Sequence, residues 1–109
     1  MDCLFCKIVS GELDTDIVYE DENFIAFKDI NPQAPVHILL IPRRHIRNFD
    51  EVKEDNLRGL VKAIHKIVDK YKLTEGYRIV NNCKENGGQE IDHLHFHILG
   101  KRRMNWPPG

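Results

Sequence analysis

Long hydrophobic runs are missing from this sequence of 109 residues. The best apolar stretch, Val36 to Ile41, is far shorter than the roughly 20 residues that a membrane-spanning helix needs. The amino terminus, Met-Asp-Cys, lacks the basic region followed by an apolar stretch that marks a secretory signal. We therefore expect a soluble, cytoplasmic protein that does not associate with a membrane.

An excess of charge of one sign is missing as well, since 16 Lys and Arg residues stand against 17 Asp and Glu residues. Without a basic patch or tail, binding to the phosphates of DNA or RNA has little support. Only three cysteines occur, and this odd number argues against a disulfide-bonded secreted domain. The length suits one hydrophobic core, so we expect a single domain over residues 1–109.

The spacing of the apolar residues predicts an α+β fold. A short helix is expected at 3–9 and one long helix at about 53–72, where apolar residues recur at three- and four-residue intervals. Strands are expected at 17–19, 24–27, 36–41, 77–82 and 92–99, with a hairpin turn at 21–23. The short connections between these strands favour an antiparallel sheet of about five strands.

Half of the six histidines stand at alternating positions near the end of the chain, as His93, His95 and His97. Alternate side chains of a strand share one face, so the imidazoles would form a row while the apolar residues between them enter the core. An imidazole titrates near neutral pH and can act as nucleophile, base, acid or metal ligand. A metal triad, a catalytic nucleophile with supporting imidazoles, and a solvated strand face are all open, although the density of histidines favours the first two.

A glycine pair directly precedes this run, in Asn86-Gly87-Gly88-Gln89. Glycines let backbone N–H groups turn toward an anion, and an amide side chain adds a donor. A glycine pair alone can equally serve the geometry of a turn. Next to imidazoles, however, it suits a phosphate.

Together these motifs resemble the histidine triad (HIT) family of nucleotide-binding hydrolases and transferases, whose His-x-His-x-His signature corresponds to 93–99. The resemblance extends over 27–37, 76–78, 87–89 and the ending Trp106-Pro107-Pro108-Gly109, which are similar to the Hint branch, the purine nucleoside phosphoramidases. It implies a HIT-like fold and a homodimer whose strands join into one sheet. Each protomer would hold a purine nucleoside monophosphate or phosphoramidate, and Trp106 in the tail would approach the neighbouring site.

The resemblance also implies the roles of the catalytic residues. His95 would attack the α-phosphorus and form a covalent nucleotidyl-histidine, with a backbone carbonyl of the same strand fixing its tautomer. His97 would contact the phosphate or the departing amine, and His37 would complete the imidazole cluster. The implied reaction is hydrolysis of the P–N bond of adenosine or guanosine 5′-phosphoramidates without a catalytic cofactor.

The implied nucleotide pocket has three parts. Asn82, Gly88 and Gln89 would hold the phosphate, and Asp29 would accept from the ribose hydroxyls. Phe5, Ile8, Phe27 and Ile30 would form the purine slot, although ordinary core packing is the common fate of such residues. Many Hint-branch members have a phosphate-binding serine where this chain has Glu90. A carboxylate repels a phosphate, so we expect Glu90 either to face solvent, which is favoured, or to contact the amine of a cationic substrate.

A second site is indicated by Cys3-x-x-Cys6, whose spacing suits zinc. By resemblance to some bacterial HIT proteins, His45 and His93 would complete a closed, structural four-ligand shell. A redox pair and two unliganded buried thiols are the competing interpretations. For the whole chain, two alternatives to the phosphoramidase remain open: a non-catalytic module that senses purine nucleotides, and a zinc-dependent hydrolase in which the triad itself binds metal.

Overall fold

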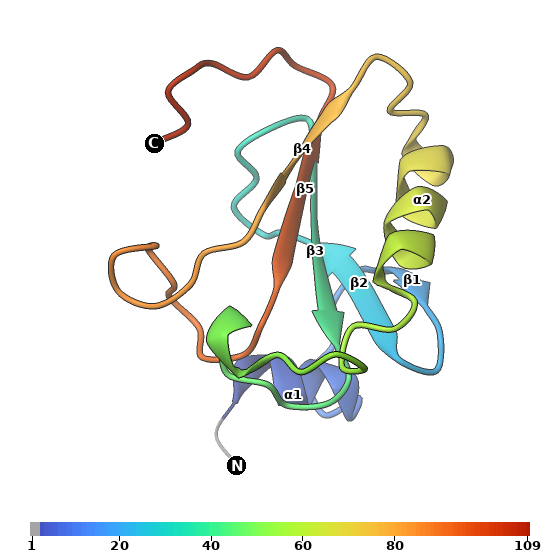
Figure 1. Cartoon of the computed structure of the whole chain (residues 1–109). Helices are drawn as coiled ribbons and strands as arrows, with labels where there is room; N and C mark the ends of the chain where they lie inside the picture. The colour runs from blue at the N-terminus through green and yellow to red at the C-terminus, as the bar shows by residue number, and fades with distance from the viewer. Residues whose placement is uncertain (1–2) are drawn as a thin grey trace.

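The computed structural model describes residues 3–109 and has the expected α+β architecture (Figure 1). Its elements, in chain order, are α1 (Leu4–Val9), β1 (Ile17–Glu20), β2 (Phe24–Lys28), β3 (Val36–Pro42), a 3₁₀ turn η1 (Phe49–Glu51), α2 (Leu60–Tyr71), β4 (Tyr77–Val80) and β5 (Phe96–Gly100). The five strands form one antiparallel sheet in the order β1-β2-β3-β5-β4. The predicted fold class, with one long and one short helix, is confirmed.

The hairpin between β1 and β2 is closed by a single carboxylate, as the turn residues predict. Asp21 Oδ1 accepts from the backbone N–H groups of Asn23 at 2.8 Å and of Phe24 at 2.7 Å. β3 then pairs with β2 on one side and with β5 on the other, which places it at the centre of the sheet. The central strand therefore carries His37 directly beside β5, where His97 lies.

The two faces of the sheet bury different clusters. On one face, α2 packs against Phe24, Leu40, Phe96 and Ile98, together with further apolar residues. On the other face, Phe5 and Ile8 of α1 join apolar residues of β2 and β3. In Figure 1, α1 lies at the end of the sheet where β3 ends, and the carboxyl-terminal tail leaves at the opposite end. The second face, beside α1, is the one that carries the site.

The long helix is shorter at its start than predicted. It begins after Gly59, whose φ of 89° is left-handed, and residues 53–58 form turns held by bonds such as Asn56 N–H to the Lys53 carbonyl at 2.9 Å. Leu57, in this turn region, still packs against the core. Its position therefore matches the spacing of the buried residues of the helix, although Leu57 is not helical. The apolar spacing therefore marked the buried residues correctly, whereas the prediction of a helix from 53 was wrong.

The histidine strand is shorter as well, because it begins at Phe96 and not at 92. The register that pairs Leu40 with Phe96 would set Leu94 opposite Pro42, which has no N–H to donate. Leu94 N–H instead donates to the Ile46 carbonyl at 2.6 Å. His93 and His95 therefore lie in an irregular segment that leads into β5, and only His97 of the triad lies within the strand. The predicted apolar alternation holds, since the residues between the histidines are buried in the α2-side core.

Among residues 3–109, the longest helix is α2 with 12 residues, and none of the helices is long and apolar enough to cross a bilayer.

Candidate active site

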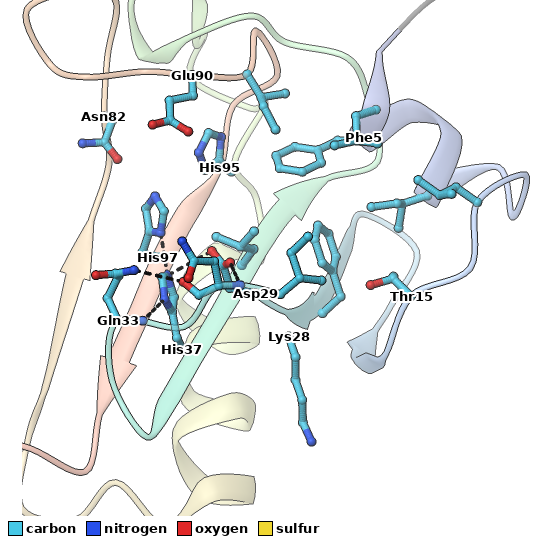
Figure 2. A pocket seen from close by; sticks show the side chains of 18 of the residues that line it. Phe5, Thr15, Lys28, Asp29, Gln33, His37, Asn82, Glu90, His95 and His97 are labelled. Atoms are coloured by element: carbon cyan, nitrogen blue, oxygen red, sulfur yellow. Dashed lines mark hydrogen bonds and ion pairs between the residues drawn. The ribbon is translucent and has the colours of Figure 1, made fainter.

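A cavity of about 700 Å³ opens on the α1 side of the sheet (Figure 2). Its walls come from α1, from the end of β2 with the loop that follows, from β3 and β5, and from the segment after β4. The residues that line it include His37, His95, His97, Asp29, Gln33, Asn82, Gly88, Glu90, Phe5, Ile8, Phe27, Ile30 and Leu39. Elements far apart in sequence thus bring imidazoles, apolar rings and polar loop residues to one place.

His95 is held in one tautomer by the backbone. Its Nδ1 lies 2.8 Å from the carbonyl oxygen of His93, and a carbonyl can only accept, so Nδ1 carries the hydrogen. The Nε2 of the neutral ring then keeps its lone pair. The carbonyl of His95 itself accepts from Asn81 Nδ2 at 2.9 Å, which anchors this residue to the end of β4. The side chain lines the cavity although it is only 7% exposed. Such a fixed ring, with a lone pair available, is chemically suited to act as a nucleophile.

His37 and His97 form a directed hydrogen-bond chain. Gln33 N–H donates to His37 Nδ1 at 3.0 Å, so the neutral His37 ring carries its hydrogen on Nε2. His37 Nε2 lies 2.8 Å from His97 Nδ1, which must therefore accept, leaving the hydrogen of His97 on Nε2. Asp29 Oδ2 lies 3.4 Å from His37 Nε2 and holds the same hydrogen from the side. The chain thus ends in a donor, the Nε2–H of His97.

Both rings of this chain are neutral at pH 7. Burial and, to a smaller extent, the neighbouring imidazoles of His95 and His37 lower the pKa of His97 to about 4. Burial also lowers the pKa of His37, although the carboxylate of Asp29 opposes this shift. The pair therefore offers N–H dipoles and not positive charge. Such donors can stabilise charge that develops on a bound oxygen.

The other end of the cavity is apolar. Phe5, Ile8, Phe27 and Leu39 are each less than 10% exposed, and the rings of Phe5 and Phe27 meet edge to face with centroids 5.4 Å apart. Phe5 also stands perpendicular to the ring of His95 at 5.2 Å. Ile30 lies at the rim, where it is almost fully exposed. These walls suit a flat ring system next to the imidazoles.

A second cluster lies behind His95, formed by Cys3, Cys6, His45 and His93. The four ligand atoms lie within 4.8 Å of one another. His93 Nε2 donates to the Pro42 carbonyl at 2.9 Å, so its Nδ1 turns a lone pair toward the cysteines. That Nδ1 lies 3.4 Å from Cys3 Sγ, 3.6 Å from Cys6 Sγ and 3.2 Å from His45 Nδ1.

These separations fit a tetrahedral zinc ion. Zn–S bonds of about 2.3 Å and Zn–N bonds of about 2.0–2.1 Å give donor-to-donor edges of roughly 3.3–3.8 Å. Cys6 Sγ and His45 Nδ1 form a further edge of 3.3 Å. Two thiols and two imidazole lone pairs are the donor set of a closed structural site. The residues present therefore fit the metal.

A comparison with protein families shows which family the chain belongs to. A family model described as the HIT domain matches residues 10–104. The chain belongs to the HIT domain family. A 14 kDa zinc-binding protein of Zea mays is 43% identical over 120 residues, which cover 97% of this chain and 87% of that protein. The resemblance read from the histidine motif is thereby confirmed.

Solved structures agree with this assignment. A HIT family hydrolase from Legionella pneumophila superposes with a TM-score of 0.92 at 46% identity, covering 99% of this chain and 100% of that one. A histidine triad nucleotide-binding protein from Candida albicans gives a TM-score of 0.89 at 30% identity, covering 97% of this chain and 83% of that one. The chain therefore has the HIT fold over nearly its whole length.

Most of the residues that the HIT resemblance singled out meet in the cavity. All three proposed catalytic histidines line it, as do Asp29, Asn82 and Glu90 among the proposed nucleotide contacts. The predicted zinc ligands form the separate cluster behind it.

Gln89 and Trp106 do not line the cavity of the single chain. The Gln89 amide is already used by the protein backbone, since Nε2 donates to the carbonyls of Arg47, in the segment after β3, at 2.7 Å and of Ile91 at 3.0 Å. Trp106 is 82% exposed. The backbone N–H groups of Gly88 and Gln89 also donate within the loop, to the carbonyls of Glu85 and Lys84.

Two further residues, Gln33 and Asn81, hold histidines of the cavity in place, and no motif of the sequence predicts them. Gln33 fixes the tautomer of His37 through its backbone N–H, which no side-chain motif can indicate. Asn81 anchors the nucleophile segment through its amide. Its place at the end of a predicted strand, next to Asn82, was the only available signal.

Proposed function

We propose that this HIT domain protein hydrolyses the P–N bond of purine nucleoside 5′-phosphoramidates through a nucleotidylated His95. The observation that carries the proposal is the contact of His95 Nδ1 with the His93 carbonyl, which leaves the Nε2 lone pair for the cavity. The relatives support the same class of chemistry, since one is described as a hydrolase and another as nucleotide-binding.

In the proposed complex the purine lies between the apolar walls, where Phe5 and Phe27 meet. Asp29, at the end of β2, accepts from the ribose hydroxyls. The phosphate then lies at His95, where the Nε2–H of His97 and the amide of Asn82 donate to its oxygens. One N–H of that amide already holds the Gly87 carbonyl at 2.7 Å, so the side chain is fixed in place before substrate binds.

The chemistry divides one displacement into two. First, the Nε2 lone pair of His95 bonds to phosphorus while the P–N bond breaks, and the amine leaves with that electron pair and one proton from solvent. Then water oxygen bonds to phosphorus, the N–P electron pair returns to His95 Nε2, and one water proton passes to solvent. The products are a nucleoside monophosphate and a free amine. His97 stabilises the phosphoryl oxygens in both steps.

We also propose that Cys3, Cys6, His45 and His93 hold a structural zinc ion. The closed donor set would tie α1 to the sheet and supply folding energy. It would contribute no group to the reaction. The zinc-binding relative from Zea mays supports this assignment.

The proposed assembly is a homodimer in which the tail of one protomer approaches the site of the other. The exposed Trp106 and the uncovered edge of β4 support it, since both are surfaces that a second copy of the chain could cover.

The decisive experiment compares His95→Ala with the wild type on adenosine 5′-phosphoramidate. We expect turnover to fall by roughly 10³-fold or more, because the loss of a nucleophile removes the covalent route. His65→Ala, on the exposed face of α2, is the matched control and should turn over normally. Quenching in alkaline detergent, which preserves the acid-labile P–N bond, followed by mass spectrometry should detect the nucleotidyl adduct in the wild type and in His65→Ala but not in His95→Ala.

Undiminished turnover by His95→Ala would contradict the proposal. Tight binding of nucleoside monophosphate with no turnover by the wild type would favour the nucleotide-sensing module instead. Turnover that disappears on metal removal, with the fold intact, would favour a zinc-dependent hydrolase.

A further inference from the structure

The cavity contains a carboxylate that the proposed reaction does not use. Glu90 lines the cavity together with Asn82 and Gly88. In Figure 2, Glu90 and Asn82 lie to one side of His95, whereas Phe5 and the apolar wall lie to the other. With the purine against the apolar wall and phosphorus at His95, the side of Glu90 is where the amine of a phosphoramidate would extend.

The Glu90 side chain is exposed, and it forms no hydrogen bond or ion pair with any of residues 3–109. It therefore has no structural partner that would explain a carboxylate at this position. A carboxylate without a partner, aimed into a cavity that binds a phosphoryl group, acts on whatever charge the ligand brings.

The surroundings do not offset this negative charge. Among the cavity-lining residues that the structure describes, Lys28 is the one Lys or Arg, and it is paired with Asp16 at 3.3 Å. In Figure 2 its side chain points away from the histidines. Since His37 and His97 are neutral, the phosphoryl oxygens meet neutral donors on one side and Glu90 on the other.

The ligands of the reaction differ in charge. A nucleoside monophosphate, with a second pKa near 6, carries close to two negative charges at pH 7. A phosphoramidate carries one, and an ammonium group on its amine portion brings the net charge to zero. A carboxylate beside the phosphorus therefore repels the product most and attracts the ammonium group of such a substrate.

We propose that Glu90 is a specificity-determining residue that selects phosphoramidates whose amine portion carries a second, positively charged group, such as a diamine or a basic amino acid. The same charge weakens the binding of the nucleoside monophosphate product. This inference rests on the proposed phosphoramidase activity, and it goes further by naming the class of amine.

The test uses two adenosine 5′-phosphoramidates of equal chain length, one made with butylamine and one with 1,4-diaminobutane. For the wild type we expect kcat/KM to be roughly three- to tenfold higher for the diamine compound, the size expected of a partly solvated ion pair. Glu90→Gln should bring the ratio close to one. Glu90→Gln should also bind AMP roughly three- to tenfold more tightly.

Glu85→Gln is the matched control, because it removes the same charge from the same loop outside the cavity. It should keep the wild-type ratio and the wild-type affinity for AMP. A preference for the diamine compound that persists in Glu90→Gln would overturn the role of Glu90.

The failure of this inference differs from failure of the proposed function. Equal kcat/KM values for the two compounds, with turnover that still depends on His95, would overturn the role of Glu90 and leave the phosphoramidase intact. Turnover of neither compound would overturn the phosphoramidase. In that case the affinities of the two compounds, measured by competition with AMP, would test the role of Glu90. Affinities that are equal in the wild type and in Glu90→Gln would contradict that role.

Discussion

Backbone groups outside the histidine run decide where the imidazole protons lie. The N–H of Gln33 fixes His37, the carbonyl of His93 fixes His95, and the carbonyl of Pro42 fixes His93. Each contact assigns a lone pair or a hydrogen to the ring nitrogen on the far side. As a result, His93 turns a lone pair toward the cysteines and His95 offers a lone pair to the cavity. The pair of His37 and His97 ends in a donor, the Nε2–H of His97.

The neutral state of His97 predicts how stability changes with pH. In the unfolded chain an imidazole takes up its proton near pH 6.5, whereas burial lowers the pKa of folded His97 to about 4. As the pH falls from about 6.5 toward 4, the unfolded state binds a proton that the folded state does not, so the free energy of unfolding falls. His97→Gln should lose less stability over this interval. Urea unfolding at about pH 7 and about pH 5 measures both slopes.

Other groups titrate over the same interval, including His37, whose pKa burial also lowers. The difference between wild type and His97→Gln cancels most of their contribution. His65→Gln, at an exposed position of α2, should keep the wild-type slope. Equal slopes for wild type and His97→Gln would mean that the ring is not buried in its neutral form.

The sequence predicted which histidines line the cavity, and the family resemblance implied the tautomer of His95, but neither predicted where the protons of His37 and His97 lie. Alternation placed the intervening residues in the core, and the family motif identified the cavity residues. The hydrogen-bond chain depends on the path of the loop over 29–35, which sets a backbone N–H against His37. No side-chain pattern encodes such a path. The shortening of β5 likewise follows from Pro42 on a neighbouring strand, which becomes relevant only once the register is known.

At the scale of elements, α1 joins the two sites. It has only six residues, too few to be stable as an isolated helix. Cys3 caps it by accepting from Cys6 N–H at 3.3 Å, and Phe5, between the two cysteines, contacts both His93 and His95. The short helix thus carries two of the four proposed zinc ligands, Cys3 at its cap and Cys6, while Phe5 forms a wall of the cavity.

Loss of the metal cluster should therefore weaken nucleotide binding as well as stability. We expect Cys3→Ser with Cys6→Ser to bind no zinc and to lose about 4 kcal/mol of unfolding free energy, measured at free zinc about 1,000-fold above the dissociation constant. AMP should bind more weakly, because Phe5 loses its anchor. Metal analysis, thermal unfolding and calorimetric titration with AMP are the three measurements.

Cys83→Ser is the control for these substitutions, since Cys83 lies outside the metal cluster. It should keep the zinc content, the stability and the AMP affinity of the wild type. An unchanged AMP affinity in the double variant, despite lost zinc, would show that the position of Phe5 does not depend on the cluster. Zinc retained by the double variant would contradict the assignment of the ligands.

At the scale of the whole molecule, β4 forms one of the two edges of the sheet. β4 is the last strand in the order, and Tyr77 and Ile79 on one of its faces are 40% and 46% exposed. An edge strand with exposed apolar residues is a surface on which a second strand can pair. The tail that carries Trp106 leaves the end of β5, the neighbour of β4, and none of residues 101–109 lines the cavity of its own chain.

We predict that the chain is a dimer in solution that pairs through β4, with a mass of twice 12.8 kDa by light scattering. Ile79→Lys should shift the equilibrium to the monomer, because a lysine on an edge strand opposes pairing. Ile17→Lys, at an exposed apolar position of the opposite edge strand β1, is the matched control and should remain dimeric.

The single tryptophan reports whether the tail reaches the partner's site. In the dimer, AMP should change the fluorescence of Trp106 and make it less accessible to a quencher, because a ring that is 82% exposed in one chain becomes covered. The monomeric Ile79→Lys variant should still bind AMP, since a single chain supplies the imidazoles and the apolar walls of the cavity, but without the fluorescence change. A full fluorescence change in that monomer would place Trp106 at the site of its own chain. This would contradict the proposal that the tail of one protomer approaches the site of the other.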